Sequence, residues 1–151
     1  MRRIVSLLRG ESDADFGPSP SLPQIPEMVA KAGPRITLEM PEELPPVPES
    51  LGLTVFRVVQ ESVTNFLKHA GPTAQAIATI TCEPEAIDIR VTDDGVGVQA
   101  STEGRGAGVR GMRERVAAMG GTFKAGPRTG GGYEVKVRLP LPSQLGRGWL
   151  K

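Results

Sequence analysis

Residues 49–70 form the longest segment with a regular hydrophobic pattern in this sequence of 151 residues. Apolar side chains recur there at steps of three and four residues, at Leu53, Phe56, Val59, Val63, Phe66 and Leu67. This spacing predicts a long amphipathic helix with one apolar stripe, which Gly71-Pro72 ends. The stripe has to be buried against a second layer of structure.

Alternating apolar residues predict that the second layer is a β-sheet. We expect strands over residues 36–40, 76–81, 86–92, 122–125 and 133–139, and shorter helices over 24–32 and 109–119. Two of the connections look like hairpins, which require antiparallel pairing. The predicted fold is α+β: a two-layer α/β sandwich with a mixed, mostly antiparallel sheet that helices cover on one face.

The remaining segments are predicted to connect these elements or to flank them. Residues 1–9 place apolar side chains between arginines, as in a short helix or the last turns of a longer one. Residues 10–23 read as a linker and residues 41–48 as a proline-rich connection. Residues 93–108 are expected to form a glycine-punctuated loop, and the chain is expected to fray from residue 140.

The charge and the rare residue types exclude several classes of function. A formal net charge of +1 gives no reason to expect a partner of nucleic acid or a membrane surface. Cys82 is the only cysteine and His69 the only histidine, so neither a disulfide framework nor a zinc site of cysteines or several histidines is possible. No signal peptide or membrane-spanning stretch is evident, and a cytoplasmic domain is the default expectation.

The first candidate for chemistry lies on the long predicted helix. Glu61 and Asn65 are four residues apart, so they share one face. Glu61 can accept a proton, Asn65 can offer its carbonyl oxygen to Mg²⁺, and Lys68 can meet a phosphate. The alternative is an ordinary solvated polar face.

The second candidate is the run Asp93-Asp94-Gly95-Val96-Gly97, which follows a predicted strand. A carboxylate at a strand end can accept a hydrogen bond from an amine, and the glycines let a flat ring approach the backbone. An ordinary Asp-Gly turn is the alternative.

The third candidate is the glycine-rich run from Gly104 to Met112, which leads into a predicted helix. Backbone N–H groups at such a helix start can bind an anion. The spacing of Gly106, Gly108 and Gly111 also matches GxGxxG, but a Rossmann fold would need a strand directly upstream. The alternative is a flexible glycine linker.

Taken together and in this order, the three motifs indicate a ligand with a purine, a divalent cation and several phosphates. The segment VVQESVTNFLKHA resembles the N box of the GHKL ATPase superfamily, DDGVG its first glycine box, and GAGVRGMRERVAAMGG its second. Over residues 36–141 the chain looks most like the ATP-binding domain of NarL/DesK-class sensor histidine kinases. The resemblance implies a Bergerat-type ATP-binding fold.

The resemblance also implies roles for individual residues. Glu61 would be the catalytic glutamate, which acts as a base or orients the reacting group, and Asn65 would be the ligand of Mg²⁺. Lys68 would contact phosphate, with His69 beside it. Asp93 would bind the amino group of adenine.

The resemblance implies that the two glycine-rich motifs make the remaining contacts with ATP. Gly95 and Gly97 would flank the adenine, and residues 98–106 would form a short ATP lid. The phosphate-binding turn and the following helix start would come from Gly106, Gly108, Val109, Arg110, Gly111 and Met112.

The implied reaction is transfer of the γ-phosphoryl group of ATP to a histidine on a dimerisation domain, followed by relay to a response regulator. His69 lies inside the N-box match, which argues against its being that histidine. We therefore expect the isolated chain to bind ATP·Mg²⁺ without phosphorylating itself. An anti-sigma-factor-type serine kinase and a non-catalytic ATP-binding module are the alternative functions.

The implied organisation has four parts. Residues 1–9 would be a remnant of a dimerisation helix, 10–34 a linker with a short helix, 35–141 the ATPase domain and 142–151 a tail. Within this cytoplasmic fragment we expect contact with neither nucleic acid nor membrane, although a full-length kinase of this class is compatible with a membrane anchor.

Overall fold

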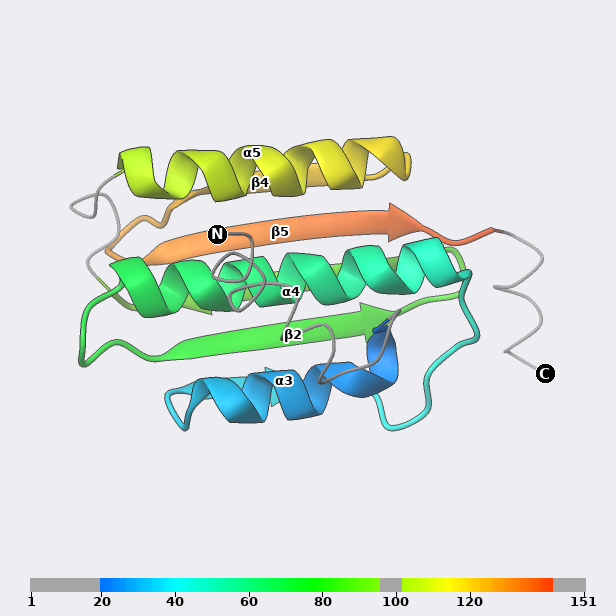
Figure 1. Ribbon diagram of the computed structural model, residues 1–151, viewed down its shortest axis with the longest axis horizontal. Helices are drawn as coiled ribbons and strands as arrows, with labels where there is room; N and C mark the ends of the chain where they lie inside the picture. The colour runs from blue at the N-terminus through cyan, green and yellow to red at the C-terminus, as the bar shows by residue number, and fades with distance from the viewer. Residues whose placement is uncertain (1–19, 96–101, 143–151) are drawn as a thin grey trace, which may run out of the picture.

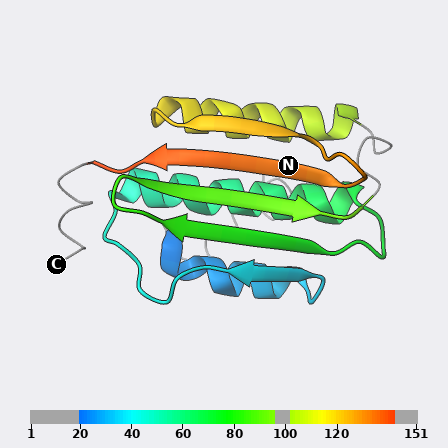
Figure 2. The ribbon, with the colours of Figure 1, turned by 180° about the vertical axis from the view of Figure 1, so that it is seen from behind.

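A computed structural model describes residues 20–95 and 102–142, with the backbone alone for residues 102–107. The elements are η2 (Leu22–Gln24), α3 (Ile25–Ala32), β1 (Ile36–Glu39), α4 (Glu49–His69), β2 (Ala76–Cys82), β3 (Ala86–Asp93), α5 (Thr102–Ala118), β4 (Thr122–Pro127) and β5 (Tyr133–Pro140). The helices lie on one face of the sheet (Figure 1), and the other face carries none of them (Figure 2). The predicted two-layer sandwich is confirmed.

The sheet has five strands in the order β1-β2-β3-β5-β4. β1 pairs with β2 in parallel, and the other neighbours are antiparallel. The hairpin of β2 and β3 places Ile80 opposite Ile89, which in turn lies opposite Val137 of β5. These side chains are buried, so the register aligns one apolar face toward the helices.

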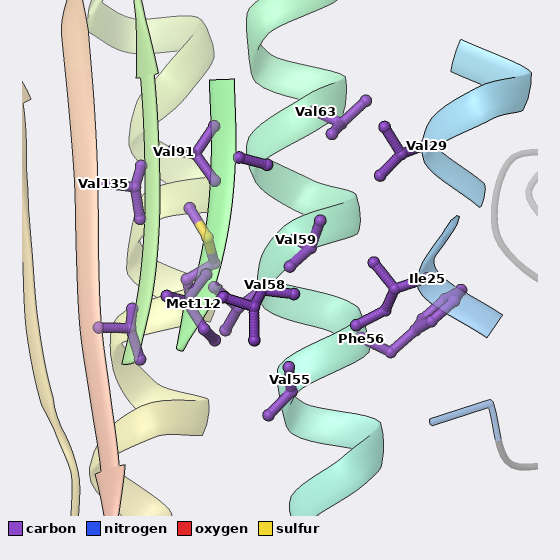
Figure 3. Packing of buried hydrophobic residues seen from close by; sticks show 14 of the residues in the cluster. Ile25, Val29, Val55, Phe56, Val58, Val59, Val63, Val91, Met112 and Val135 are labelled. Carbon is purple, nitrogen blue, oxygen red and sulfur yellow. The ribbon is translucent and has the colours of Figure 1, made fainter. Parts of the chain in front are cut away.

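The core fills the space between that face and the helices (Figure 3). α4 lies over the middle of the sheet (Figure 1). The buried face of α4 is wider than the predicted stripe, because Val55 and Val58 are also fully buried. Leu67, which was expected in the stripe, is 43% exposed. The buried face is wide because α4 contacts α3 on one flank and α5 on the other, as well as β3 beneath.

The helix expected from Val109 begins at Thr102, so the prediction of a loop is wrong for residues 102–108. Glycine lowers helix stability by about 1 kcal/mol relative to alanine, and the three glycines at 104, 106 and 108 hid the helix from sequence analysis. Packing of α5 against α4 and β4 stabilises the helix despite the low helix propensity of its first residues. The part of the expected loop between 96 and 101 lies outside the described residues.

Two other predicted boundaries need correction. The linker expected to reach Pro23 ends earlier, because Pro20 and Leu22 are buried and η2 follows. At the other end β5 includes Pro140, and the N–H of Leu141 donates to the carbonyl of Glu85 at 2.9 Å. The expected helix over 1–9, the first part of the linker and the tail from 143 lie outside the described residues.

Among the residues that the structure describes, no helix is long and apolar enough to cross a membrane.

Candidate nucleotide-binding site

The polar face of α4 carries the first part of the candidate site. Asn65 is only 6% exposed, and its Nδ2 atom is buried with no hydrogen-bond partner among the described residues. A buried polar group without a partner is costly, so this amide is suited to bind a group that approaches from outside the chain. Glu61, one turn earlier, is partly exposed.

Asp93, at the end of β3, is held in a fixed position. It is 7% exposed, and its Oδ1 accepts a hydrogen bond from the N–H of Gly95 at 2.8 Å. Its backbone carbonyl accepts another from Arg128 at 3.0 Å. One carboxylate oxygen is therefore used within the turn, which leaves Oδ2 to accept from a ligand.

Gly95 brings this turn against the end of α4. A Cβ at Gly95 would meet the backbone carbonyl of Ala70, the residue that caps α4. Asp94 fastens the same turn to the start of β2, because its Oδ1 accepts from the N–H of Gln75 at 2.7 Å. A side chain at residue 95 would force the two elements apart.

The second glycine-rich motif lies in α5 and contacts the polar face of α4. A Cβ at Gly108 of α5 would meet the carboxylate of Glu61 and would lie 3.4 Å from Nδ2 of Asn65. Farther along α5, Met112 is 2% exposed, and its sulfur accepts a hydrogen bond from the Ser62 hydroxyl at 3.6 Å. The structure thus brings together the first and the third of the three motifs that were predicted to share a ligand.

A small cavity of about 70 Å³ lies between these two helices. It is lined by Arg57, Gln60, Glu61, Gly108, Gly111, Met112 and Arg115. Its wall combines basic side chains with a carboxylate and bare glycine backbone. Such a surface suits a charged group better than an apolar one.

The two parts of the site lie along the same helix. Gly95 contacts α4 at Ala70, and Gly108 contacts it at Glu61. Nine helical residues separate these contacts, which is about 13 Å along the axis. A ligand that reached both would need an extended shape with chemically different ends.

The other predicted site residues are more scattered. Lys68 and His69 are in the last turn of α4, the lysine exposed and the histidine half-buried. Val109 is partly buried, and Arg110 is exposed. Gly106 lies inside the α5 helix, and Gly97 lies outside the described residues.

The helix was expected to start at Gly106–Gly111, but α5 starts earlier, at Thr102. These residues fall within α5, where each backbone N–H is directed to the carbonyl four residues earlier. They are therefore not available as anion donors in this conformation.

Sequence analysis missed the residues that hold Asp93 in place. Arg128 and Gly132 belong to the β4–β5 connection, and a Cβ at Gly132 would meet the Asp93 carbonyl. Gly132 also has φ +93°, a region that favours glycine. The three consecutive glycines 130–132 were a signal of close approach, but no local pattern identified Asp93 as the partner.

A second missed residue is Arg35, which lies before β1. Its Nη1 donates to the carbonyls of Gly71 and Ala74, at 2.8 and 3.0 Å. Its guanidinium also lies over the Phe66 ring, 5.0 Å from the centroid. Arg35 thereby fixes the turn that leads out of α4, next to the contact with Gly95.

Comparison with known proteins agrees with this geometry. The family described as "Histidine kinase-, DNA gyrase B-, and HSP90-like ATPase" matches residues 51–143. The histidine-protein kinase/phosphatase UhpB of Salmonella typhimurium is 38% identical over 92 residues, 61% of this chain and 18% of that protein. The sensor histidine kinase NarS of Mycobacterium tuberculosis is 35% identical over 128 residues, 79% of this chain and 29% of that protein.

Solved structures show the same fold. The histidine kinase domain of the blue-light activated kinase of Erythrobacter litoralis EL346 aligns with a TM-score of 0.58 at 23% identity. That alignment covers 82% of this chain and 59% of the other. The ATP-binding domain of PrrB from Mycobacterium tuberculosis gives 0.52 at 23% identity, over 78% and 88% of the two chains.

Fold and site together define an ATP-binding domain of the GHKL class. The chain belongs to the histidine kinase-, DNA gyrase B- and HSP90-like ATPase family. It spans less than a third of the length of the two curated relatives it was compared with.

The residues present fit ATP with Mg²⁺. No group of three acidic, histidine or cysteine side chains that could hold a metal ion occurs among the described residues. Mg²⁺ usually keeps several waters and is held by one or two carboxylates together with substrate phosphates; Asn65 would add a single neutral oxygen to such a set. The orientation of an amide is assigned from its hydrogen bonds, and a turned Asn65 presents its oxygen.

Proposed function

We propose that this chain is the ATP-binding catalytic domain of a sensor histidine kinase. It would pass the γ-phosphoryl group to a histidine on a dimerisation domain, for relay to a response regulator. The observation that carries the proposal is the contact of Gly108 with Glu61 and Asn65, which joins the two motifs of an ATP site. The names of UhpB and NarS favour a histidine as acceptor over a serine.

At the adenine end, Asp93 would select the base. Its free carboxylate oxygen can accept from the exocyclic amine of adenine, whereas guanine presents a carbonyl oxygen at that position and would be repelled. The hydrogen bond from Gly95 holds the carboxyl group in one orientation, and the hydrogen bond from Arg128 to the Asp93 carbonyl holds the backbone beside it. A rigid acceptor loses less entropy on binding than a mobile one.

At the phosphate end, Asn65 and Glu61 would act on neighbouring atoms. Mg²⁺, when bound at Asn65, would neutralise phosphate charge. Glu61 would orient the incoming imidazole and accept its proton, and Lys68 would supply a positive charge. Most of the rate enhancement would come from positioning and charge neutralisation.

The same proposal requires α5 to change shape. In the present conformation the helix begins at Thr102, and Gly108 lies against the Glu61 carboxylate. For the N–H groups of residues 106–111 to reach phosphates, the first turns of α5 have to unwind. Their glycine content makes this change inexpensive.

The acceptor histidine would come from elsewhere. His69 is the only histidine of the sequence, and it lies in the last turn of α4 within the matched family region. The proposed location is the cytoplasm, where ATP and response regulators are found together.

Equilibrium binding of a fluorescent ATP analogue, with and without Mg²⁺, tests the proposal. Asn65→Ala should remove the strengthening effect of Mg²⁺ on ATP affinity, whereas Thr64→Ala, at the preceding position of α4, should retain it. Unchanged Mg²⁺ dependence in Asn65→Ala would show that Asn65 is not the metal ligand.

Incubation with γ-labelled ATP tests the acceptor. The isolated chain should carry no stable label, and adding the dimerisation domain that belongs to its kinase should produce acid-labile phosphohistidine on that domain. Strong labelling of His69, or acid-stable transfer to serine, would contradict the proposed reaction.

A further inference from the structure

Figure 2 shows the face of the sheet opposite the helices. A hollow of about 630 Å³ lies on this face. Strands β2, β3, β5 and β4 line it, through side chains that include Arg90, Lys124 and Lys136. None of the candidate nucleotide-site residues contributes to its wall. The hollow is therefore a separate surface on the far side of the domain.

The strand register aligns three cations across this face. Arg90 of β3 lies opposite Lys136 of β5, and Lys136 lies opposite Lys124 of β4. Neighbouring strands are about 4.8 Å apart, so the three residues form a basic row about 10 Å long. Like charges directly opposite each other destabilise a sheet, so this arrangement carries a cost for the fold.

The carboxylates on this face do not neutralise the row. Arg90 pairs with Glu134 at 2.6 Å, but neither Lys124 nor Lys136 forms an ion pair with any carboxylate that the structure describes. Both lysines are exposed. The basic row thus keeps two free positive charges side by side.

The acidic residues next to the row are engaged elsewhere. Arg138, two residues beyond Lys136 on β5, pairs with Asp88, Glu83 and Glu85 at 2.8, 3.4 and 3.6 Å. The nearby carboxylates hold the pKa of the Arg138 guanidinium above its ordinary value, Asp88 contributing most. Three carboxylates share this one cation, so the side of the basic row that faces the β2–β3 turn carries a net negative charge.

We propose that the basic row docks an acidic α-helix of a partner protein, laid across the strands. Carboxylates at positions i, i+3 and i+7 of a helix share one face and advance by about 4.5 and 10.5 Å. The row offers cations at about 0, 4.8 and 9.6 Å. Two carboxylates of the helix would meet Lys136 and Lys124, which pair with no described carboxylate, and the third would share Arg90 with Glu134. Docking at this face leaves the nucleotide site on the other side open.

The bordering carboxylates argue for a helix over other polyanions. A nucleic acid or an anionic bilayer presents phosphates over a broad area. Such an area would also press phosphates against Glu83, Glu85 and Asp88, three carboxylates that share the single cation of Arg138. A single helix face places negative charge along the row alone.

Two helical peptides of identical composition test the geometry. One carries three glutamates at i, i+3 and i+7, and the other spreads them around the helix. NMR titration of the full chain should show at least ten-fold tighter binding of the aligned peptide, with shifts concentrated on β3, β4 and β5. Equal affinity for both peptides, or shifts on the helical face, would overturn the proposal.

Variants of the chain test the residues. Lys124→Gln with Lys136→Gln should weaken the aligned peptide at least ten-fold, whereas Lys31→Gln on the exposed side of α3 should not. Because neutralising opposed lysines removes a repulsion, the double variant should fold as well as the parent. Tighter binding of phosphatidylserine vesicles or of single-stranded DNA than of the aligned peptide would also refute the proposal.

Discussion

Asp93 is the residue on which base selectivity depends in the proposed site. Asp93→Asn keeps an oxygen that can accept from the N–H of Gly95, but it replaces the free acceptor with an amide N–H₂ that faces the adenine amine. The lost hydrogen bond to a charged group is worth about 1.5–3 kcal/mol. We therefore expect ATP affinity to fall ten-fold or more, as measured by calorimetry.

Asp94→Asn is the matched control for this substitution. Asp94 is exposed, and its side chain accepts a hydrogen bond from the N–H of Gln75, which an asparagine oxygen can accept equally well. ATP affinity should stay within two-fold of the parent. A normal affinity in Asp93→Asn would remove Asp93 from the adenine site.

Cys82 provides a pH-dependent observable. Burial raises the pKa of the Cys82 thiol, because desolvation disfavours the thiolate. Above pH about 8.5 the thiol of the unfolded chain has begun to lose its proton, whereas the Cys82 thiol of the folded chain still keeps it. This contribution to stability is complete below the unfolded pKa and is lost as the pH rises through the folded pKa.

Alkylation by iodoacetamide, which reacts with the thiolate, measures the Cys82 shift. The midpoint of the rate against pH should lie higher in the folded chain than in the chain unfolded by urea. Coincident midpoints would show that burial does not affect the thiol.

At the scale of elements, α5 couples stability to binding. Gly111 has open space where a Cβ would be, whereas a Cβ at Gly108 would meet Glu61. Alanine favours a helix over glycine by about 1 kcal/mol. Gly111→Ala should therefore raise the unfolding temperature by about 3–5 °C, and Gly108→Ala should raise it by less, because Glu61 has to move.

Gly111→Ala should weaken ATP binding even though it stabilises the fold. If the first turns of α5 unwind to bind phosphate, about 1 kcal/mol of added helix stability should weaken ATP about five-fold. The measurement is ATP affinity beside the unfolding temperature of the same variant. A variant that is stabilised and binds ATP as the parent does would exclude unwinding of α5.

The elements that could be predicted are those whose signal is local. The spacing of apolar residues gave α4 and the β2–β3 hairpin nearly to the residue. The start of α5 was missed because its glycines mask a helix that only tertiary packing stabilises. Arg128 could not be connected with Asp93, since 35 residues separate them and no local pattern records the contact.

At the scale of the whole molecule, the core extends before the expected ATPase domain. Leu22, Ile25, Met28 and Val29 are 7% exposed or less and belong to the same cluster as the α4 side chains (Figure 3). Sequence analysis placed these residues in a linker with a short helix, because eight residues of α3 are too few to indicate a partner. The fold shows that α3 closes one flank of the core beside α4.

Removal of this segment should unfold the domain. Burying four large apolar side chains contributes about 1.5–3 kcal/mol each, which sums to about 6–12 kcal/mol and is comparable with the stability of a whole domain. A fragment of residues 35–151 should lack a cooperative thermal transition, whereas a fragment of residues 20–151 should unfold like the full chain. Calorimetry and circular dichroism of the two fragments measure this. Cooperative unfolding of 35–151 within a few degrees of the parent would mean that α3 is an appendage and that the ATPase domain begins at residue 35, as the sequence predicts.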